Sequence, residues 1–179
     1  MQIQTSRFGT VELNSEDLIE FSEGILGFAN LRKFVLLDDP TDEIFAWLQS
    51  CESPAIAFPI LEPELFMTGK YNIQFNRRDY EALQMAPSDK FHTFCIITIP
   101  NDPRQMTANL KAPVIINSKT KFGRQCVLQD NGLAIREPIF AALQQRVVQM
   151  PPQPIKSKAM DTGVAIRLPG LPSSPDASV

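Results

Sequence analysis

The stretch MTANLKAPVIIN, residues 106–117, decides how the rest of the chain is interpreted, because it combines a strand-like pattern with a proline. Residues 109–117 alternate between an apolar and a mostly polar face, which predicts a half-buried strand. The apolar face comprises Leu110, Ala112, Val114 and Ile116, and the other comprises Asn109, Lys111, Pro113, Ile115 and Asn117. Proline cannot donate to a strand ladder, so the sequence predicts an edge or bulged strand, which is either protected or used for docking.

Similar short runs lie on both sides of this stretch, separated by turn signals. Strands are predicted at 2–5, 10–13, 18–21, 33–38, 44–49, 55–61, 71–75, 91–99 and 124–128. The segments SRFG and SKTKFG are typical of hairpin turns. Helices are predicted at 77–84 and 138–150, the second with Phe140, Leu143, Val147 and Met150 on one face. Together these patterns predict a mainly β fold, a compact antiparallel β-barrel-like domain with a few short helices.

Proline divides the chain into two parts. Six of the 15 prolines follow residue 150, and few large apolar residues accompany them. Such a composition cannot bury enough apolar surface to offset the entropy of ordering. We therefore predict one domain at 1–149 and a proline-rich, disordered tail at 150–179. A docked segment around VAIRL (164–168) is the alternative.

Composition and charge narrow the class of protein. The net charge is −3 and the pI is about 5.2, so the chain lacks the broad positive field that usually attracts nucleic acid. Its apolar runs are far shorter than the roughly 20 residues that span a bilayer, and its first residues lack the apolar core of a secretory signal. Three widely spaced cysteines fit reduced thiols. We expect a cytoplasmic protein that contacts neither membrane nor nucleic acid directly.

The sequence offers little for catalysis. Its single histidine, His92, lies three residues from Cys95, and side chains three apart on one strand point to opposite faces. Paired metal-ligand motifs and phosphate-binding glycine motifs are absent. Trp47 lies in a run that is apolar on both faces and is expected in the core. We predict no catalytic residue, metal or cofactor, and no enzyme.

The stretch 106–117 resembles the most distinctive segment of the FliW family of flagellar assembly factors. The segments IQTSRFGTVEL, IEFSEGILGF, KFVLLDD, WLQS, IAFPI, IITIPNDPRQ and IREPI also resemble that family, in the same order, over roughly residues 1–140. The resemblance implies a β-barrel-like partner switch that binds CsrA, a translational repressor of flagellin mRNA, and also flagellin. As a hypothesis, docking involves Met106, Thr107, Asn109, Lys111, Pro113, Asn117 and Phe28.

One segment departs from the family pattern. Residues 66–90, often acidic in this family, here carry Lys70, Arg77 and Arg78. This leaves open a diverged, chaperone-like paralogue that binds flagellin without CsrA. A small nucleic-acid-binding barrel is the second alternative, because Lys111, Lys119, Lys121, Phe122 and Arg124 gather near one hairpin. We expect a monomer.

Overall fold

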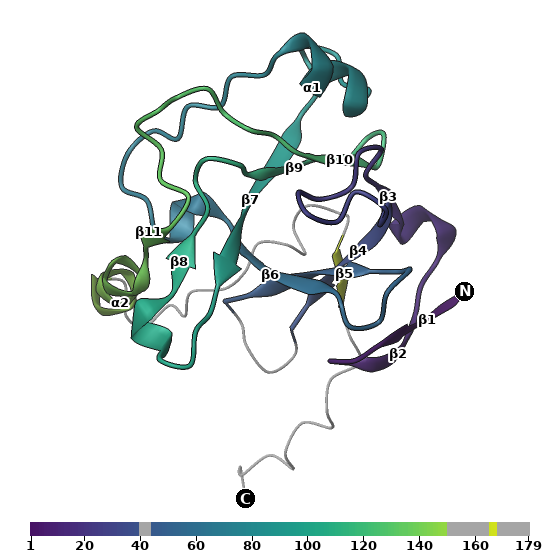
Figure 1. The fold of residues 1–179 in the computed structure, drawn as a ribbon, viewed down its shortest axis with the longest axis horizontal. Coiled ribbons are helices and arrows are strands. Elements are labelled where there is room, and N and C mark those ends of the chain that lie inside the picture. Colours follow the sequence, from purple (N-terminus) through teal and green to yellow (C-terminus); the bar gives the residue numbers. More distant parts are fainter. Residues whose placement is uncertain (40–43, 150–164, 168–179) are drawn as a thin grey trace, which may run out of the picture.

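The structure is a computed structural model that describes residues 1–39, 44–149 and 165–167 (Figure 1). Its centre is a closed barrel of seven strands. These are β3 (Ile19–Glu20), β4 (Lys33–Asp38), β5 (Ala46–Ser50), β6 (Ala57–Leu61), β7 (Phe91–Thr98), β9 (Val114–Asn117) and β10 (Phe122–Gln125). The barrel closes because β7 pairs with both β6 and β9, while β10 pairs with both β9 and β3. The predicted mainly β, barrel-like fold is confirmed.

All neighbours in the barrel are antiparallel except β3 and β10. Those two strands are parallel and share a single residue pair, Glu20 with Phe122, supported by the bond from the Glu20 amide to the Lys121 carbonyl (2.9 Å). We call this junction the seam. It joins parts of the chain that lie about a hundred positions apart.

Further elements surround the barrel. They are the strands β1 (Gln2–Thr5), β2 (Gly9–Glu12), β8 (Thr107–Ala108), β11 (Glu137–Pro138) and β12 (Ala165–Arg167), and the helices α1 (Arg77–Ala82) and α2 (Phe140–Gln149). Three single 3-10 turns cover Ser15–Asp17, Pro63–Leu65 and Pro103–Gln105. In Figure 1, α1 caps the top of the view, α2 lies to the left, and the β1–β2 hairpin lies at the lower right.

Large apolar side chains fill the barrel. Ile19, Phe21, Phe34, Leu36, Leu48, Ile60, Phe94, Val114 and Ile116 are at most 1% exposed and form one cluster. Gly123 on β10 completes this packing, because the ring of Phe21 lies where a side chain at 123 would stand. Glycine at this position is therefore required by space rather than by backbone conformation.

The outside of the barrel is covered in three places. The β1–β2 hairpin buries Val35, Leu37 and Trp47, which confirms the expected core position of the tryptophan. The segment after α1 covers Ile115, and a third cluster joins the ends of β6 and β7 to α2. Strands covered on both sides need apolar residues on both faces, which explains why simple alternation is weak in this sequence.

The opening stretch forms two short strands instead of one. β8 ends at Ala108, residues 109–113 form a loop, and β9 then runs through the barrel wall between β7 and β10. The predicted edge strand is therefore wrong, since β9 has partners on both sides. Every residue of β9 is buried, because the α1 segment covers the face that the alternation predicts to be polar and exposed.

Other boundaries also differ from the prediction. Residues 71–75 form no strand, contrary to the prediction, and the side chains of Tyr71, Ile73 and Phe75 pack on the domain instead. The last helix begins at Phe140, because Pro138 belongs to β11. Leu143 is buried as expected, whereas the side chains of Val147 and Met150 lie outside the described residues. The predicted disordered tail also falls on residues outside the described ones, except for β12. This strand pairs with β4, as the alternative of a docked segment around 164–168 predicts.

Candidate partner-binding surface

Three of the predicted binding residues lie inside the domain. Met106 is buried in the cluster beside α2, Pro113 is buried, and Asn117 is fully buried. The Asn117 side chain donates to the Leu83 carbonyl (3.2 Å) and accepts from the Lys119 amide (3.0 Å), so it holds the turn after β9. The premise that these three side chains face solvent is wrong, and their role in docking stays a prediction.

The other four predicted residues, Thr107, Asn109, Lys111 and Phe28, are partly exposed. The Asn109 side chain accepts from the Ala112 amide (3.1 Å), which fixes the loop between β8 and β9. The Lys111 ammonium donates to the Asp130 carbonyl (2.8 Å). Phe28 packs edge-on against Phe58, with ring centroids 5.3 Å apart. The side chains of Asn109, Lys111 and Phe28 are therefore held by local contacts while part of each still faces solvent.

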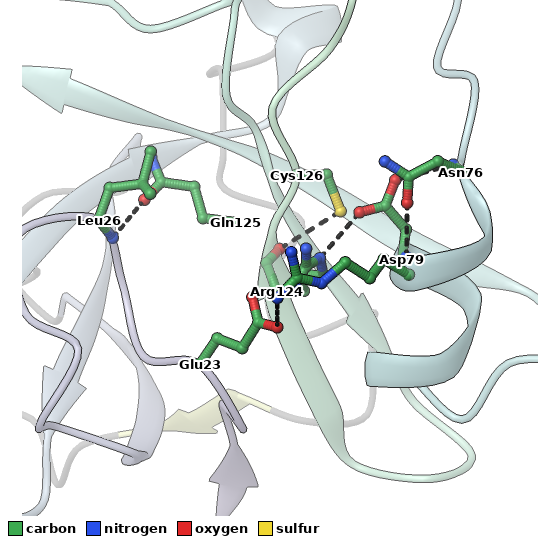
Figure 2. Close-up of polar contacts among 8 residues, drawn as sticks. Glu23, Leu26, Asn76, Asp79, Arg124, Gln125 and Cys126 are labelled. Carbon is green, nitrogen blue, oxygen red and sulfur yellow. Dashed lines mark hydrogen bonds and ion pairs between the residues drawn. The ribbon is translucent and has the colours of Figure 1, made fainter.

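The structure brings two separately predicted regions together through Gln125. Its side-chain oxygen accepts from the Leu26 amide (2.9 Å), and its side-chain nitrogen donates to the Ala112 carbonyl (3.1 Å), as Figure 2 shows in part. Residues 126–128 run beside the same loop, since the amides of Cys126 and Leu128 donate to the carbonyls of residues 113 and 111. We call residues 23–28, 109–113 and 126–128 the Gln125 face.

The Gln125 face carries exposed apolar side chains. Leu26 is 58% exposed and Val127 is 45% exposed. Leu26 stands out because its turn is fixed by Gly24, whose φ is +67° and where an added methyl would lie 2.5 Å from the Phe28 carbonyl oxygen. A large apolar side chain held outward on a rigid turn is a suitable anchor for a protein partner.

An ionic network adjoins this face and includes one of its residues, Glu23. The Arg124 guanidinium donates to Asp79 (2.8 Å) at the start of α1 and to Glu23 in the 23–28 turn, where Arg78 also binds (3.1 Å). Figure 2 shows Arg124 between the two carboxylates. The hydrogen bond from Arg124 lowers the pKa of Glu23. We call these four residues the Arg124 network, which ties β10, α1 and the turn into one unit.

Sequence reasoning misses this network and the buried role of Gln125. Arg124 and Glu23 lie 101 positions apart, so no local pattern connects them. The network also uses one of the charges of the possible nucleic-acid patch: the Arg124 side chain is only 14% exposed. Lys119 of the same hairpin lies 3.8 Å from the Asp89 carboxylate. These carboxylates offset the positive charge that a phosphate backbone would need.

A second surface is a groove along the segment between β6 and α1. It has a volume of about 780 Å³, and its lining includes the apolar or aromatic side chains Met67, Tyr71, Ile73 and Phe91 together with Glu64. Ile73 and Phe91 also line a neighbouring hollow of about 450 Å³. The Tyr71 hydroxyl donates to the Leu110 carbonyl, which fixes the groove to the loop before β9. The groove therefore lies in the segment that departs from the expected acidic pattern.

The thiols are poorly suited to catalysis. Burial raises the pKa of Cys95 to about 12 and that of Cys51 to about 11, and it also raises the pKa of Cys126. The nucleophilic form of cysteine is the thiolate, which these surroundings disfavour. Burial, with a smaller contribution from Lys121, lowers the pKa of His92. Within the described ranges, no group of three or more acidic, histidine or cysteine side chains is arranged to hold a metal ion.

The helices in the described part of the chain include none that is long and apolar enough to cross a membrane. This finding agrees with the short apolar runs in the sequence.

Comparison with known proteins connects this barrel to a family. The family described as "FliW protein" matches residues 2–139. The flagellar assembly factor FliW of Bdellovibrio bacteriovorus is 62% identical over 168 residues, which cover 94% of this chain and 95% of that protein. The protein of the same name from Thermoanaerobacter pseudethanolicus is 37% identical over 145 residues, covering 80% of this chain and 96% of its own.

A solved structure agrees with these sequence matches. The crystal structure of a flagellar assembly factor FliW superimposes with a TM-score of 0.70 and 30% sequence identity, covering 77% of this chain and 96% of that one. Residues 2–139, which match the family, contain the barrel, the Gln125 face and the groove. The chain belongs to the FliW family.

Proposed function

We propose that this chain is a flagellar assembly factor that acts as a non-enzymatic partner switch, binding the translational regulator CsrA and also flagellin. The observation that carries the proposal is the near full-length match to a flagellar assembly factor FliW, with 62% identity and no large unmatched part in either chain. In this scheme, free protein would hold CsrA away from flagellin mRNA, and accumulating flagellin would occupy the protein and release CsrA. Both exchanges would take place in the cytoplasm.

The chemistry of the chain supports binding rather than catalysis. Its thiols are held in the protonated form by burial. The net charge of −3 suits a protein that antagonises an RNA-binding partner, because it disfavours phosphate close to that partner. The ion pairs of Lys119 and Arg124 weaken the competing proposal of a nucleic-acid-binding barrel.

The Gln125 face is our proposed docking surface. It combines an exposed apolar side chain, Leu26, with partly exposed polar groups at Asn109 and Lys111 on a rigid support. Interfaces of this kind gain affinity from a few desolvated anchors, while polar groups at the rim set orientation. Leu26→Ser should therefore weaken the binding of CsrA or of flagellin by at least tenfold.

The matched control is Ile99→Ser, which changes a partly exposed apolar side chain (40%) just after β7, outside the Gln125 face. Lys111→Ala tests the polar rim, and Asn109→Asp keeps the acceptor that fixes the loop. Equal affinities for Leu26→Ser and the control, with both proteins folded, would move the docking surface to the groove.

The proposed function itself is tested by calorimetric titration of the purified chain with CsrA, repeated with flagellin already bound. Binding of CsrA that flagellin abolishes is the expected result. Binding of flagellin alone would indicate the diverged, chaperone-like paralogue, with the basic residues of 66–90 as the first explanation. Binding of neither partner, together with nuclease-sensitive retention of RNA, would overturn the proposal in favour of the nucleic-acid-binding barrel.

A further inference from the structure

The barrel wall has an opening beside β4. On one side β5 pairs with residues 34–38 of β4, but on the other side β3 pairs only with Phe34 and Lys33. The remaining edge, Leu36–Asp38, is occupied by β12 from the far end of the chain, in parallel register with Ala165 opposite Leu36. An exposed strand edge is a template for another strand, and here the chain supplies that strand itself.

The segment that fills this edge lies outside the shared family domain. The family match ends at residue 139. The Thermoanaerobacter relative aligns over 96% of its own length but only 80% of this chain, so it has little length left for a segment like 150–179. The solved FliW structure shows the same relation, with 96% of that chain covering 77% of this one. β12 is therefore an addition to the domain, placed on an edge that the domain leaves unfilled.

The pairing has the character of an exchangeable contact. It comprises three residue pairs and is parallel, and parallel pairing is slightly less stable per residue than antiparallel pairing. Its advantage is the covalent tether, which gives a segment of the same chain an effective concentration in the millimolar range. A free strand could take its place only by overcoming that advantage.

The neighbourhood of the edge defines what such a strand would be. Leu36 belongs to the barrel interior, and Leu37 belongs to the cluster under the β1–β2 hairpin with Trp47. A strand added beside these residues extends two apolar faces, so it should be apolar on both faces and able to donate backbone hydrogen bonds. The sequence GVAIRL around β12 is apolar except for Arg167, which lies opposite Asp38 at the end of the site.

We propose that the edge of β4 at Leu36–Asp38 is a strand-docking site, that β12 is its intramolecular occupant, and that an extended apolar segment of a protein partner gains the site only by displacing β12. Docking of this kind uses main-chain hydrogen bonds for affinity and neighbouring side-chain positions for selectivity. The proposal does not depend on which partner the family domain binds.

The first test releases β12 in the full chain with the double substitution Ala165→Pro and Ile166→Pro. Successive amides of a strand point to opposite edges, so two adjacent prolines remove whichever amide faces β4. The control carries Ala159→Pro and Met160→Pro, which lie in the same tail but outside β12. Hydrogen exchange of the edge-facing amides in Leu36–Asp38 should accelerate at least tenfold in the released variant and stay unchanged in the control.

The second test supplies the strand in trans as a synthetic peptide of residues 162–169, TGVAIRLP. The peptide should bind the released variant at least tenfold more tightly than the parent chain and restore slow exchange at the β4 edge. A peptide with prolines at positions 165 and 166 should not bind. Unchanged exchange in the released variant, or equal peptide affinity for variant and parent, would overturn the proposal. Neither readout involves CsrA or flagellin, so the result is independent of the proposed function.

Discussion

Gly123→Ala should destabilise the barrel, although it adds only one methyl group. The added carbon would lie 2.5 Å from Cζ of Phe21 and 2.7 and 2.9 Å from its two Cε atoms. Carbon atoms prefer separations of roughly 3.5–4.0 Å, so the ring would have to move by about 1 Å. Phe21 is fully buried among Phe34 and its neighbours, and close-packed interiors leave no room for that shift.

The size of the effect follows from this overlap. Overpacking a filled core typically costs about 1–3 kcal/mol. For a chain of this length, each kcal/mol lowers the melting temperature by roughly 2–4 °C, so we expect a fall of roughly 2–12 °C. Gly69→Ala is the matched control, because a methyl there meets nothing within 4 Å and the backbone is not in the left-handed region. It should leave stability unchanged or raise it by about 0.4–1 kcal/mol, since alanine restricts the unfolded chain.

Thermal and urea unfolding, followed by circular dichroism, would measure both variants. A double-mutant cycle with Phe21→Leu sharpens the test, because removing the ring atoms should relieve the clash. The double variant should be less destabilised than the sum of the two single variants, by roughly 0.5–3 kcal/mol. If Gly123→Ala is as stable as Gly69→Ala, or shows no coupling to position 21, the packing argument is refuted.

Three further predictions concern charge and protonation. Arg124→Met should cost about 3 kcal/mol in urea unfolding, because it removes the cation beside the buried Asp79 carboxylate and leaves that charge with the neutral Asn76 amide as a partner. Glu23→Gln, at the exposed end of the network, should cost less than about 1 kcal/mol, and equal losses for the two variants would contradict the network. Since burial lowers the pKa of His92, the unfolded chain binds the proton more readily, so stability should fall as pH drops below about 6.5. His92→Gln should flatten that part of the stability–pH curve, and an unchanged slope would contradict this assignment. Native thiol labelling at pH 7 should leave Cys95 unmodified until the protein unfolds, and rapid native labelling would contradict its burial.

The elements that the sequence predicts well are those whose pattern is local. The β1–β2 hairpin, β4 and the turn between β9 and β10 follow from short apolar runs and turn residues. The family-like segments are also local, and their order along the chain points to the family that matches residues 2–139. These features need no knowledge of what lies across the molecule.

The elements that it predicts poorly depend on distant partners. The alternation of polar and apolar residues places Asn117 on an exposed face, yet Asn117 is buried. The segment after α1 covers β9, and the Asn117 side-chain amide donates to the Leu83 carbonyl of that segment. Gln125 appears to be an ordinary strand residue, but it bonds to a turn 99 positions away. Part of the expected docking surface is therefore misplaced, because its exposure is decided by long-range covering.

The seam between β3 and β10 has a consequence for the order in which the chain leaves the ribosome. The ribosome adds Glu20 102 residues before its partner Phe122. At about 5–20 residues per second, the delay between the two is roughly 5–20 s. Late in that interval the apolar wall strands β3 to β7 have been synthesised, but β10, which closes the barrel, has not. The nascent chain therefore passes through a stage in which Phe21 and Phe34 lack their final cover, and exposed apolar surface of this kind favours aggregation until β10 is added.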